Sequence, residues 1–249
     1  MWKNRGGGVR FVANAAKFIS IPGSPVAYWI SKVLSAAFVK GEQFSKVGSP
    51  RVGLQTSDNN RFLRYWYEVC LTDTNFKATD CINAFALGKK WYPHNKGGTY
   101  RKWYGNLDYV INYQNNGQIL RQTKGAAIIP DKIVFMEAIT YSRLCAGNIS
   151  FRLQPQGCIF DSASVNAYVE ESKRYYVLAF LNTKVSAIMA QTISPTINTQ
   201  PGDIAKLSII YDLKKKDIIG ELTKENLIIA KEEWDSFEES WDFKKHPLI

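Results

Sequence analysis

Apolar residues at helical spacing mark the first quarter of the chain. Between residues 26 and 38 they recur every three or four positions, after Pro25 at a favourable helix start and before Gly41 as a stop signal. A similar stripe over residues 61–70 follows Asp58, whose side chain can cap a helix N-terminus. The pattern predicts two helices, over residues 26–38 and 61–70.

The middle of the chain changes to short apolar runs separated by turn residues, which is typical of strands. Asn116-Gly117 is a strong turn signal after the first of these runs. Strands are predicted over four segments: residues 109–113, 133–141, 149–153 and 158–160.

Helical spacing returns in the last third of the chain. An apolar stripe over residues 170–192 predicts one long helix that ends before Pro195, and residues 198–204 are predicted to form a constrained loop. From Leu227 to Trp241, apolar and aromatic residues repeat at intervals of 7, 3 and 4 positions. This spacing predicts a terminal amphipathic helix with an acidic outer face.

Together these elements predict an α+β fold, with a strand-rich central domain and helices packed around it. No glycine-rich turn follows a predicted strand, so a Rossmann methyltransferase fold is not expected. We expect an N-terminal helical segment over residues 1–50, a central domain over residues 51–211, and the acidic amphipathic helix within residues 212–249.

The charge of the chain is unevenly distributed. The formal net charge is +10, but residues 212–249 hold ten acidic and seven basic residues, so the first 211 residues carry +13. A basic body of this kind favours a polyanionic partner.

Four cysteines without a C-x-x-C pair, and only two histidines, predict reduced thiols and no metal site. No signal peptide is visible, and no apolar segment is long enough to span a bilayer. We therefore expect cytoplasmic residence and no membrane partner.

The most distinctive motif interleaves cations and rings. Between Cys81 and Asp108 there is no acidic residue, and residues 89–104 contain five Lys or Arg and five aromatic residues. Cations bind phosphates, ring faces stack on bases, and a glycine pair lets backbone N–H groups approach a phosphate. The nucleic-acid-binding residues predicted here are Lys89, Lys90, Trp91, Tyr92, Asn95, Lys96, Gly97, Gly98, Arg101, Lys102, Trp103 and Tyr104.

An alternative stays open for this motif: a solvated basic loop flanked by core aromatics. Trp91, Tyr92, Trp103 and Tyr104 either stack on an unpaired base or anchor the loop in the core.

A second group of candidates lies upstream. Arginine pairs bidentately with guanine, and asparagine with adenine, in the major groove. The residues predicted to contact base edges are Asn59, Asn60, Arg61 and Arg64.

Several kinds of active site lack their motifs in this sequence. No two of the nine prolines are adjacent, so the Pro-Pro-aromatic loop that grips a flipped base is absent, and no turn for S-adenosylmethionine is visible. We predict no catalytic, cofactor-binding or metal-binding residue. A magnesium nuclease through Asp131, Glu171 and Lys173 is a weaker alternative, because the spacing is long and the last two begin a predicted helix.

The acidic segment over residues 234–243 contains more rings than an ordinary exposed helix face. Either these rings pack in the core or they form a docking surface for a domain that this chain lacks.

Several strings along the chain resemble the PglX family, the adenine-specific DNA methyltransferases of bacteriophage exclusion (BREX) defence systems. They lie over residues 56–66, 91–106, 159–161, 181–184, 194–198, 202–204, 234–243 and 246–248. The resemblance covers nearly the whole chain. It implies a much longer parent protein that transfers a methyl group from S-adenosylmethionine to adenine.

The resemblance further implies that this chain is the target-recognition region alone: an excised piece, the product of a truncated frame, or a separate subunit. We expect it to bind double-stranded DNA sequence-specifically for a methyltransferase domain held in cis or in trans, in a restriction-modification-like phage defence. Other BREX components are further candidate partners. The alternative function is a protein-interaction scaffold in a defence complex.

Overall fold

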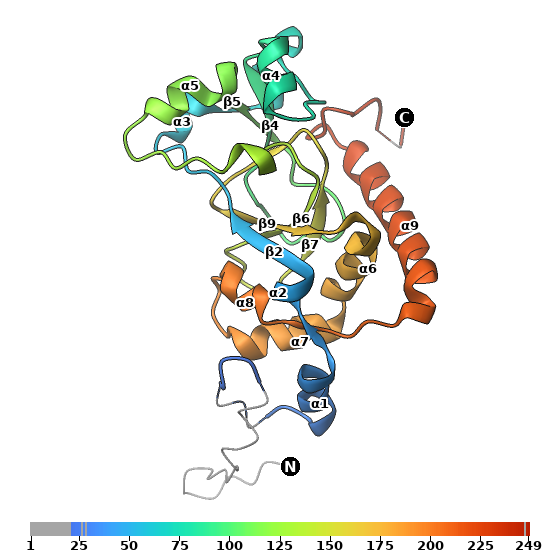
Figure 1. Cartoon of the computed structure of the whole chain (residues 1–249). Coiled ribbons are helices and arrows are strands. Elements are labelled where there is room, and N and C mark those ends of the chain that lie inside the picture. The colour runs from blue at the N-terminus through green and yellow to red at the C-terminus, as the bar shows by residue number, and fades with distance from the viewer. Residues whose placement is uncertain (1–20, 26, 28, 247) are drawn as a thin grey trace, which may run out of the picture.

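The computed structural model describes residues 21–25, 27, 29–246 and 248–249, so the first twenty residues of the predicted 1–50 segment lie outside it. The fold is α+β, as expected. The described residues form two four-stranded sheets and one two-stranded sheet, and the two larger sheets lie one above the other in the view of Figure 1, with helices around them.

The first four-stranded sheet is antiparallel and lies in the middle of Figure 1. Its strands, in spatial order, are β2 (Gly48–Val52), β9 (Ser164–Val169), β6 (Ala138–Ser142) and β7 (Phe151–Gln154). Apolar side chains from this sheet form the larger core with the helices α6 (Glu171–Leu181), α7 (Lys184–Ile193) and α8 (Pro201–Ala205).

The second sheet lies above it, at the end of the molecule that carries three short helices (Figure 1). Its strands, in spatial order, are β3 (Leu63–Tyr65), β5 (Tyr109–Asn112), β4 (Trp91–Asn95) and β8 (Ile159–Phe160). Only the β4–β8 pair of this sheet is parallel. The three helices are α3 (Asn59–Phe62), α4 (Cys81–Leu87) and α5 (Gln114–Gln122).

The remaining elements join the predicted N-terminal segment to the central domain. Strand β1 (Glu42–Gln43) pairs with β10 (Ser208–Ile209), and α2 (Phe44–Val47) follows directly. Phe38 and Phe44 belong to the same buried cluster as Ile139. The hydrophobic core therefore crosses residue 50, and the division of the chain at residues 50 and 211 stays a prediction.

The first helix begins later than its apolar stripe suggests. The Ser31 hydroxyl accepts a hydrogen bond from the Leu34 N–H group at 3.1 Å, so α1 (Lys32–Lys40) begins after this cap. Residues 26 and 28 lie outside the described residues. Gly41 follows the helix, as predicted.

The predicted helix over residues 61–70 is wrong, although its cap is confirmed. Asp58 accepts from the Arg61 N–H group at 3.0 Å, but α3 ends at Phe62 and the chain becomes extended at Leu63. Leu63 pairs with Ile111 of β5, because backbone pairing with a neighbouring strand outweighs the local helical spacing.

The predicted helix over residues 170–192 is two helices, α6 and α7. The side-chain amide of Asn182 donates to the carbonyl of Phe151 at 2.9 Å and accepts from its N–H group at 3.1 Å. Asn182 thereby bonds the backbone of β7, and the Thr183 hydroxyl caps the new helix by accepting from Ser186. The apolar spacing continues across Asn182, so periodicity alone could not reveal the break between the two helices.

The strand predictions are correct in part. Strands are found at all four sites, although the strand predicted over residues 133–141 begins only at Ala138. Asn115, Asn116 and Gly117 adopt left-handed backbone angles, so the predicted turn is confirmed, but it leads into a helical turn rather than a second strand. Residues 201–204 of the predicted loop belong instead to α8, whose capping box joins Gln200 and Asp203.

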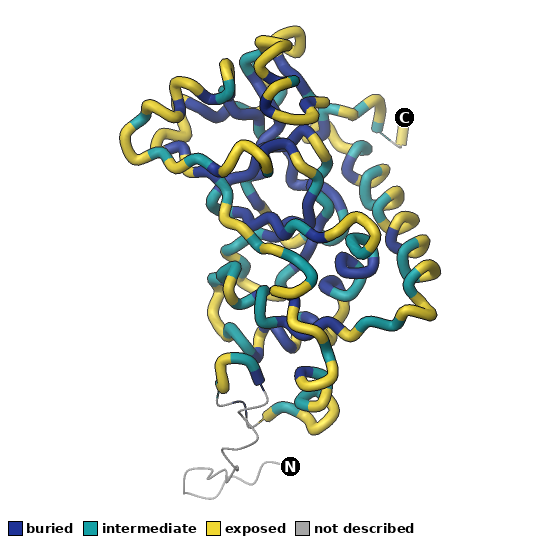
Figure 2. The backbone as a smooth tube through the Cα atoms, viewed as in Figure 1, coloured by how far each residue is buried: buried dark blue, intermediate teal, exposed yellow. Residues whose placement is uncertain are grey.

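The terminal helix α9 (Lys216–Asp235) lies along one side of the molecule and contacts α6 (Figure 1). Its outward turns are mostly exposed, whereas the strands are mostly buried (Figure 2). Trp234 is 6% exposed and packs with Tyr104, Leu107 and Cys158.

The helix ends at Asp235, so Phe237 and Trp241 lie beyond it. None of the helices in the described residues is long and apolar enough to cross a membrane.

Candidate nucleic-acid interface

The first half of the basic-aromatic stretch is a buried strand, not a loop. All five residues of β4 are buried, and this strand lies between β5 and β8. Tyr92 is 1% exposed, and its hydroxyl donates to the carbonyl of Ala84 at 2.9 Å. Trp91 and Tyr104 are also buried, and Trp103 is half-buried. In this structure, Trp91, Tyr92 and Tyr104 therefore anchor the stretch in the core, as the alternative interpretation of these rings predicted.

Two cations of the stretch donate to backbone carbonyls. The Nζ of Lys89 donates to Thr72 at 2.6 Å, and the Nζ of Lys102 donates to Asn182 at 2.8 Å. Both lysines are half-buried.

Two more cations lie over aromatic rings. The Nζ of Lys90 is 5.3 Å from the ring centre of Trp91, and that of Lys96 is 4.9 Å from the ring centre of Tyr109. Such contacts contribute about 0.5–1 kcal/mol at exposed sites, so phosphates can compete for these two lysines.

Arg101 is the cation of the stretch that pairs with a carboxylate. Its guanidinium bonds Glu233 of α9 and lies 5.0 Å from the ring centre of Trp234. Arg101 therefore attaches the stretch to the terminal helix.

The glycine pair serves close packing within the chain. Gly97 and Gly98 have φ angles of +81° and +134°. A Cβ atom on Gly98 would meet the side-chain amide of Asn106 at 2.8 Å, and one on Gly97 would meet the carbonyl of Ala163 at 3.2 Å. Only glycine fits both positions without strain.

Asn95 links the two sheets. Its amide nitrogen donates to the Thr140 hydroxyl at 2.8 Å and to the Gln154 side chain at 3.0 Å, on β6 and β7. Its side-chain oxygen accepts from the Gly97 N–H group at 3.1 Å. Asn95 is 1% exposed, so it reaches no ligand in this structure.

The upstream candidates present a different environment. Asn59, Asn60 and Arg61 are exposed on α3, which lies at the end of the molecule that carries the second sheet (Figure 1). Arg64 differs from them, because it is half-buried and its guanidinium donates to the carbonyls of Asn60 and Leu63, each at 2.6 Å.

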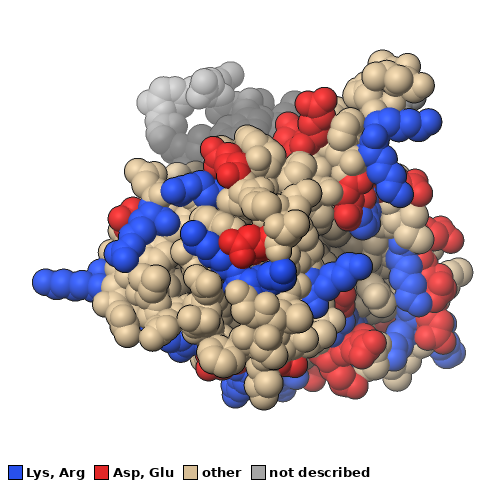
Figure 3. Space-filling model, turned by 90° about the horizontal axis from the view of Figure 1, so that it is seen from above, with Lys and Arg blue, Asp and Glu red and all other residues tan. Residues whose placement is uncertain are grey.

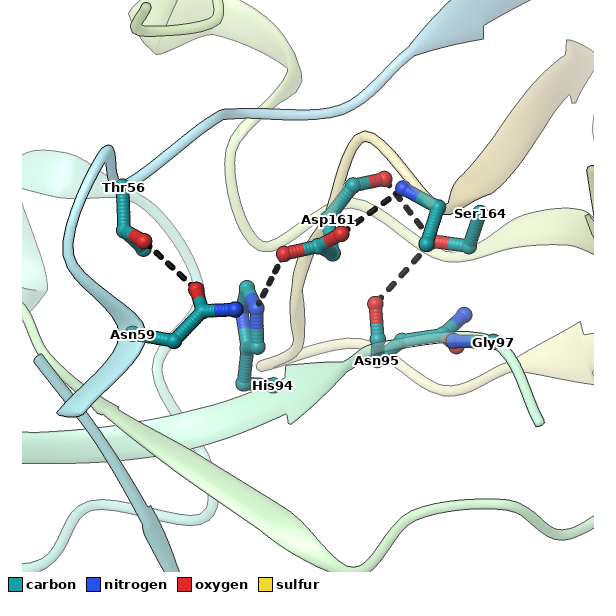
Figure 4. A network of polar contacts seen from close by, with 8 residues as sticks. Thr56, Asn59, His94, Asn95, Gly97, Asp161 and Ser164 are labelled. Carbon is teal, nitrogen blue, oxygen red and sulfur yellow. Dashed lines mark hydrogen bonds and ion pairs between the residues drawn. The ribbon is translucent and has the colours of Figure 1, made fainter. Parts of the chain in front are cut away.

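A polar hollow of about 350 Å³ lies beside α3. The Thr56 hydroxyl donates to the side-chain oxygen of Asn59 at 2.6 Å, which orients this amide at the hollow (Figure 4). Within the described part of the chain, the amide nitrogen of Asn59 forms no hydrogen bond. The lining residues are Gln55, Thr56, Ser57, Asn59, Asp161 and Ser162.

Asp161, which lines this hollow, contacts the buried imidazole of His94. The Nε2 of His94 lies 3.4 Å from a carboxylate oxygen of Asp161, and the other carboxylate oxygen accepts from the Ala163 N–H group at 2.7 Å (Figure 4). Burial alone would raise the pKa of Asp161, but its hydrogen bonds to His94 and Ala163 and the nearby charge of Lys96 lower it. Asp161 therefore stays ionised and fixes the ring of His94.

Sequence reasoning did not single out Thr56, His94 or Asp161 as site residues. A lone histidine and a lone aspartate 67 positions apart give no spacing signal. Only the tertiary pairing of β4 with β8 brings them together.

On the face seen in Figure 3, the charged side chains do not form a field of one sign. Viewed from the end that carries the second sheet, Lys and Arg are spread across the face with Asp and Glu among them (Figure 3). The described residues contain no cluster of three or more His, Cys, Asp or Glu that could hold a metal ion. Asp131 of the nuclease alternative pairs with Arg121.

The Gly97-Gly98 pair does not form the kind of turn that typically holds S-adenosylmethionine. A nucleotide-like cofactor is held where a glycine-rich turn leads from a strand into a helix N-terminus. Gly97 and Gly98 follow β4, but no helix begins there, and the next helix along the chain is α5.

No family model matches the chain. It is 35% identical over 241 residues to the adenine-specific methyltransferase PglX of Lacticaseibacillus casei (strain Zhang), covering 93% of this chain and 20% of that protein. It is 36% identical over 241 residues to the adenine-specific methyltransferase BrxX of Escherichia coli O9:H4 (strain HS), covering 93% of this chain and 18% of that protein.

The class of protein that the chain resembles is thus the adenine-specific methyltransferases, and the chain spans about a fifth of the length of the curated relatives it matches. The resemblance to PglX is confirmed for a partial region of that protein.

Proposed function

We propose that this chain is the target-recognition region of an adenine-specific DNA methyltransferase and binds double-stranded DNA sequence-specifically. In this proposal it contributes no catalytic group, and methyl transfer from S-adenosylmethionine takes place on a methyltransferase domain in cis or in trans. The observation that carries the proposal is the exposed Asn59-Asn60-Arg61 tip beside a polar hollow, in a chain similar over 93% of its length to PglX and BrxX.

The tip has the chemistry for direct base readout. An asparagine amide pairs with both hydrogen-bonding groups on the major-groove edge of adenine, and a guanidinium pairs with both on that of guanine. Asp58 caps α3 and Thr56 orients Asn59, so part of the ordering cost of these side chains is met before DNA binds. Each good bidentate pair discriminates against the wrong base by about 1–3 kcal/mol.

The phosphate contacts proposed for Lys89, Lys90, Lys96, Arg101 and Lys102 require exchange of internal contacts. Lys90 and Lys96 exchange most easily, because their main contacts are with rings, although Lys96 also leaves the nearby charge of Asp161. If all five cations bind phosphates, the logarithm of affinity should fall with the logarithm of salt concentration at a slope on the order of −4. A flat salt response in a filter-binding titration would contradict these contacts.

Selection from a pool of randomised duplexes, followed by fluorescence anisotropy on the enriched and a scrambled duplex, tests base readout. Asn60→Ala and Arg61→Ala should each reduce the preference for the enriched sequence about tenfold, with a small change on the scrambled duplex. Lys215→Ala, at an exposed position before α9, is the matched control and should keep the full preference. Recovery of no enriched sequence, or equal losses on both duplexes, would exclude base readout by the tip.

Arg64→Ala tests whether Arg64 contacts DNA, as proposed for Asn59, Asn60 and Arg61, or only supports α3. Because the Arg64 guanidinium already binds two carbonyls, base contact requires it to leave them. Loss of preference at one base pair would place Arg64 at the DNA, and an equal loss on every duplex would assign it to support of α3. Arg101→Ala combined with Lys102→Ala should weaken binding to all duplexes alike.

A further inference from the structure

A second hollow, outside the tip of α3, lies between the turn after β3 and the segment after α9. Its volume is about 720 Å³. Four aromatic rings, two carboxylates and one imidazole line it, and it is here called the aromatic-acidic hollow: Trp66, Tyr67, Phe237, Phe243, Glu238, Glu239 and His246. Part of the acidic segment over residues 234–243, for which the sequence left core packing and a docking surface open, lines this hollow, whereas Trp234 is in the core.

Two rings of the hollow are exposed, and Trp66 and Phe243 are half-buried. Tyr67 is 60% exposed and Phe237 is 42% exposed. The Tyr67 ring stacks on Tyr65 at 5.3 Å with 3° between the planes, and it lies edge-on to Trp66 at 5.8 Å. Tyr65 stacks in turn on Tyr109 at 4.6 Å, so the rings form a supported platform.

The segment after α9 is fixed against this platform. The Nε1 of Trp66 donates to the carbonyl of Glu239 at 2.8 Å, and the Trp241 ring lies 5.1 Å from Phe76. The buried Ser240 donates to Asp235 at 2.6 Å. A surface held in this way pays little ordering entropy when a partner binds.

The hollow is also electronegative. Glu238 and Glu239 are exposed, and neither forms an ion pair among the described residues. Asp108 adds negative charge: burial, and then the carboxylate of Glu239, raise its pKa to about 6. Lys244 and Lys245 line a different hollow with Asp235 and Asp242. These carboxylates therefore favour a cationic occupant.

We propose that the aromatic-acidic hollow is a docking site for a protein segment that presents an arginine flanked by apolar residues. A guanidinium stacks on a ring face and bonds a carboxylate with its fork of N–H groups, and the remaining rings cover apolar neighbours. Duplex DNA is disfavoured here because its phosphates meet Glu238 and Glu239. The site goes beyond DNA recognition, because it lies outside the residues proposed to contact DNA.

Isothermal titration with the acetylated, amidated peptide Leu-Arg-Leu-Arg-Leu tests the proposal on the full chain. The variant with Glu238→Gln and Glu239→Gln keeps the backbone bond to Trp66 and should bind the peptide at least fivefold more weakly. The matched control carries Glu225→Gln and Glu232→Gln, at exposed α9 positions, and should bind within twofold of the unmodified chain. Phe237→Ala should also weaken binding.

Further measurements distinguish an arginine-containing segment from the other molecules that could occupy the hollow. The peptide Leu-Glu-Leu-Glu-Leu should not bind, and the lysine counterpart should bind more weakly than the arginine peptide. Equal affinity of the arginine peptide for the hollow variant, the control and the unmodified chain would overturn the proposal. Displacement of the peptide by single-stranded oligothymidylate, or self-association that Phe237→Ala abolishes, would assign the hollow to a nucleic acid or to a second copy of the chain and would equally overturn it.

Discussion

Individual side chains in this protein often serve the fold where their type suggests a ligand. Tyr92 and Asn95 illustrate this: one donates from the core to Ala84, and the other joins the two sheets through Thr140. A ring or an amide has the same donors and acceptors for a base as for its own chain. Burial decides between these partners, and burial of a single position is set by strands far away in the sequence.

Asp108 gives a test at the residue scale. Its pKa is raised to about 6, first by burial and second by Glu239, whereas it is ordinary in the unfolded chain. The folded state therefore binds more protons than the unfolded state between about pH 4 and pH 6, and stability falls as pH rises through this window. Asp108→Asn should gain about 1 kcal/mol over the unmodified chain at pH 7.5, a value reduced for partial solvent exposure.

Urea unfolding at pH 4 and at pH 7.5 measures this difference. The advantage of Asp108→Asn should disappear at pH 4, where the native carboxyl is itself protonated. An advantage of the same size at both pH values would mean that packing, not ionisation, distinguishes the two chains. Glu232→Gln, at an exposed site, should show no such pH dependence.

Local patterns located most elements but not their ends. The stripe over residues 170–192 continues through Asn182, and that over residues 61–70 through Leu63, yet both helices stop. In each case a backbone partner on another strand, Phe151 or Ile111, takes the residue out of the helix. Strand β4 was missed because it contains a proline and two polar residues, His94 and Asn95, that are nevertheless buried, so neither an apolar run nor alternation marks it.

Substitution of a glycine by alanine tests whether the backbone around it has the conformation seen in the structure. Gly220 lies inside α9, and a Cβ atom there would meet nothing within 4 Å. Gly220→Ala should stabilise the chain by about 0.5–1 kcal/mol, because alanine loses less backbone entropy in a helix. Thermal unfolding measures the gain, and an unchanged or lower Tm would indicate that α9 is not helical there in solution.

At Gly53, unlike Gly220, there is no space for a Cβ atom. A Cβ atom on Gly53 would lie 2.3 Å from the carbonyls of Phe160 and Asp161. Gly53→Ala should therefore destabilise the region where β2 leads toward α3, in contrast to Gly220→Ala.

At the scale of the whole molecule, helix α9 and the basic-aromatic stretch support each other. Arg101 bonds Glu233 and lies over the ring of Trp234, and Trp234 packs on Tyr104. The acidic tail thus compensates part of the basic body, which is one reason that the face in Figure 3 is mixed in sign. The basic residues 1–211 and the acidic residues 212–249 thus neutralise each other in part through contacts inside the molecule.

Trp234→Ala tests this attachment. Removal of a side chain that is 6% exposed should cost about 3–5 kcal/mol and lower Tm by about 10 °C. Ile229→Ala, at a site on the same helix that is 64% exposed, is the control and should change stability by less than about 0.5 kcal/mol. A loss below 1 kcal/mol for Trp234→Ala would show that α9 contributes little to the fold.

The sequence by itself determined the α+β class, the helices at both ends of the described chain, the Asp58 cap and the resemblance to PglX. These follow from local periodicity, from capping chemistry and from strings of residues, all of which are written along the chain. Only the tertiary structure decided that Trp91, Tyr92 and Asn95 are internal, that His94 meets Asp161, and that Trp66 and Tyr67 join Phe237 in one hollow. The physical reason is that burial and pairing depend on contacts between residues far apart in sequence, and no local pattern specifies which distant segment a side chain will meet.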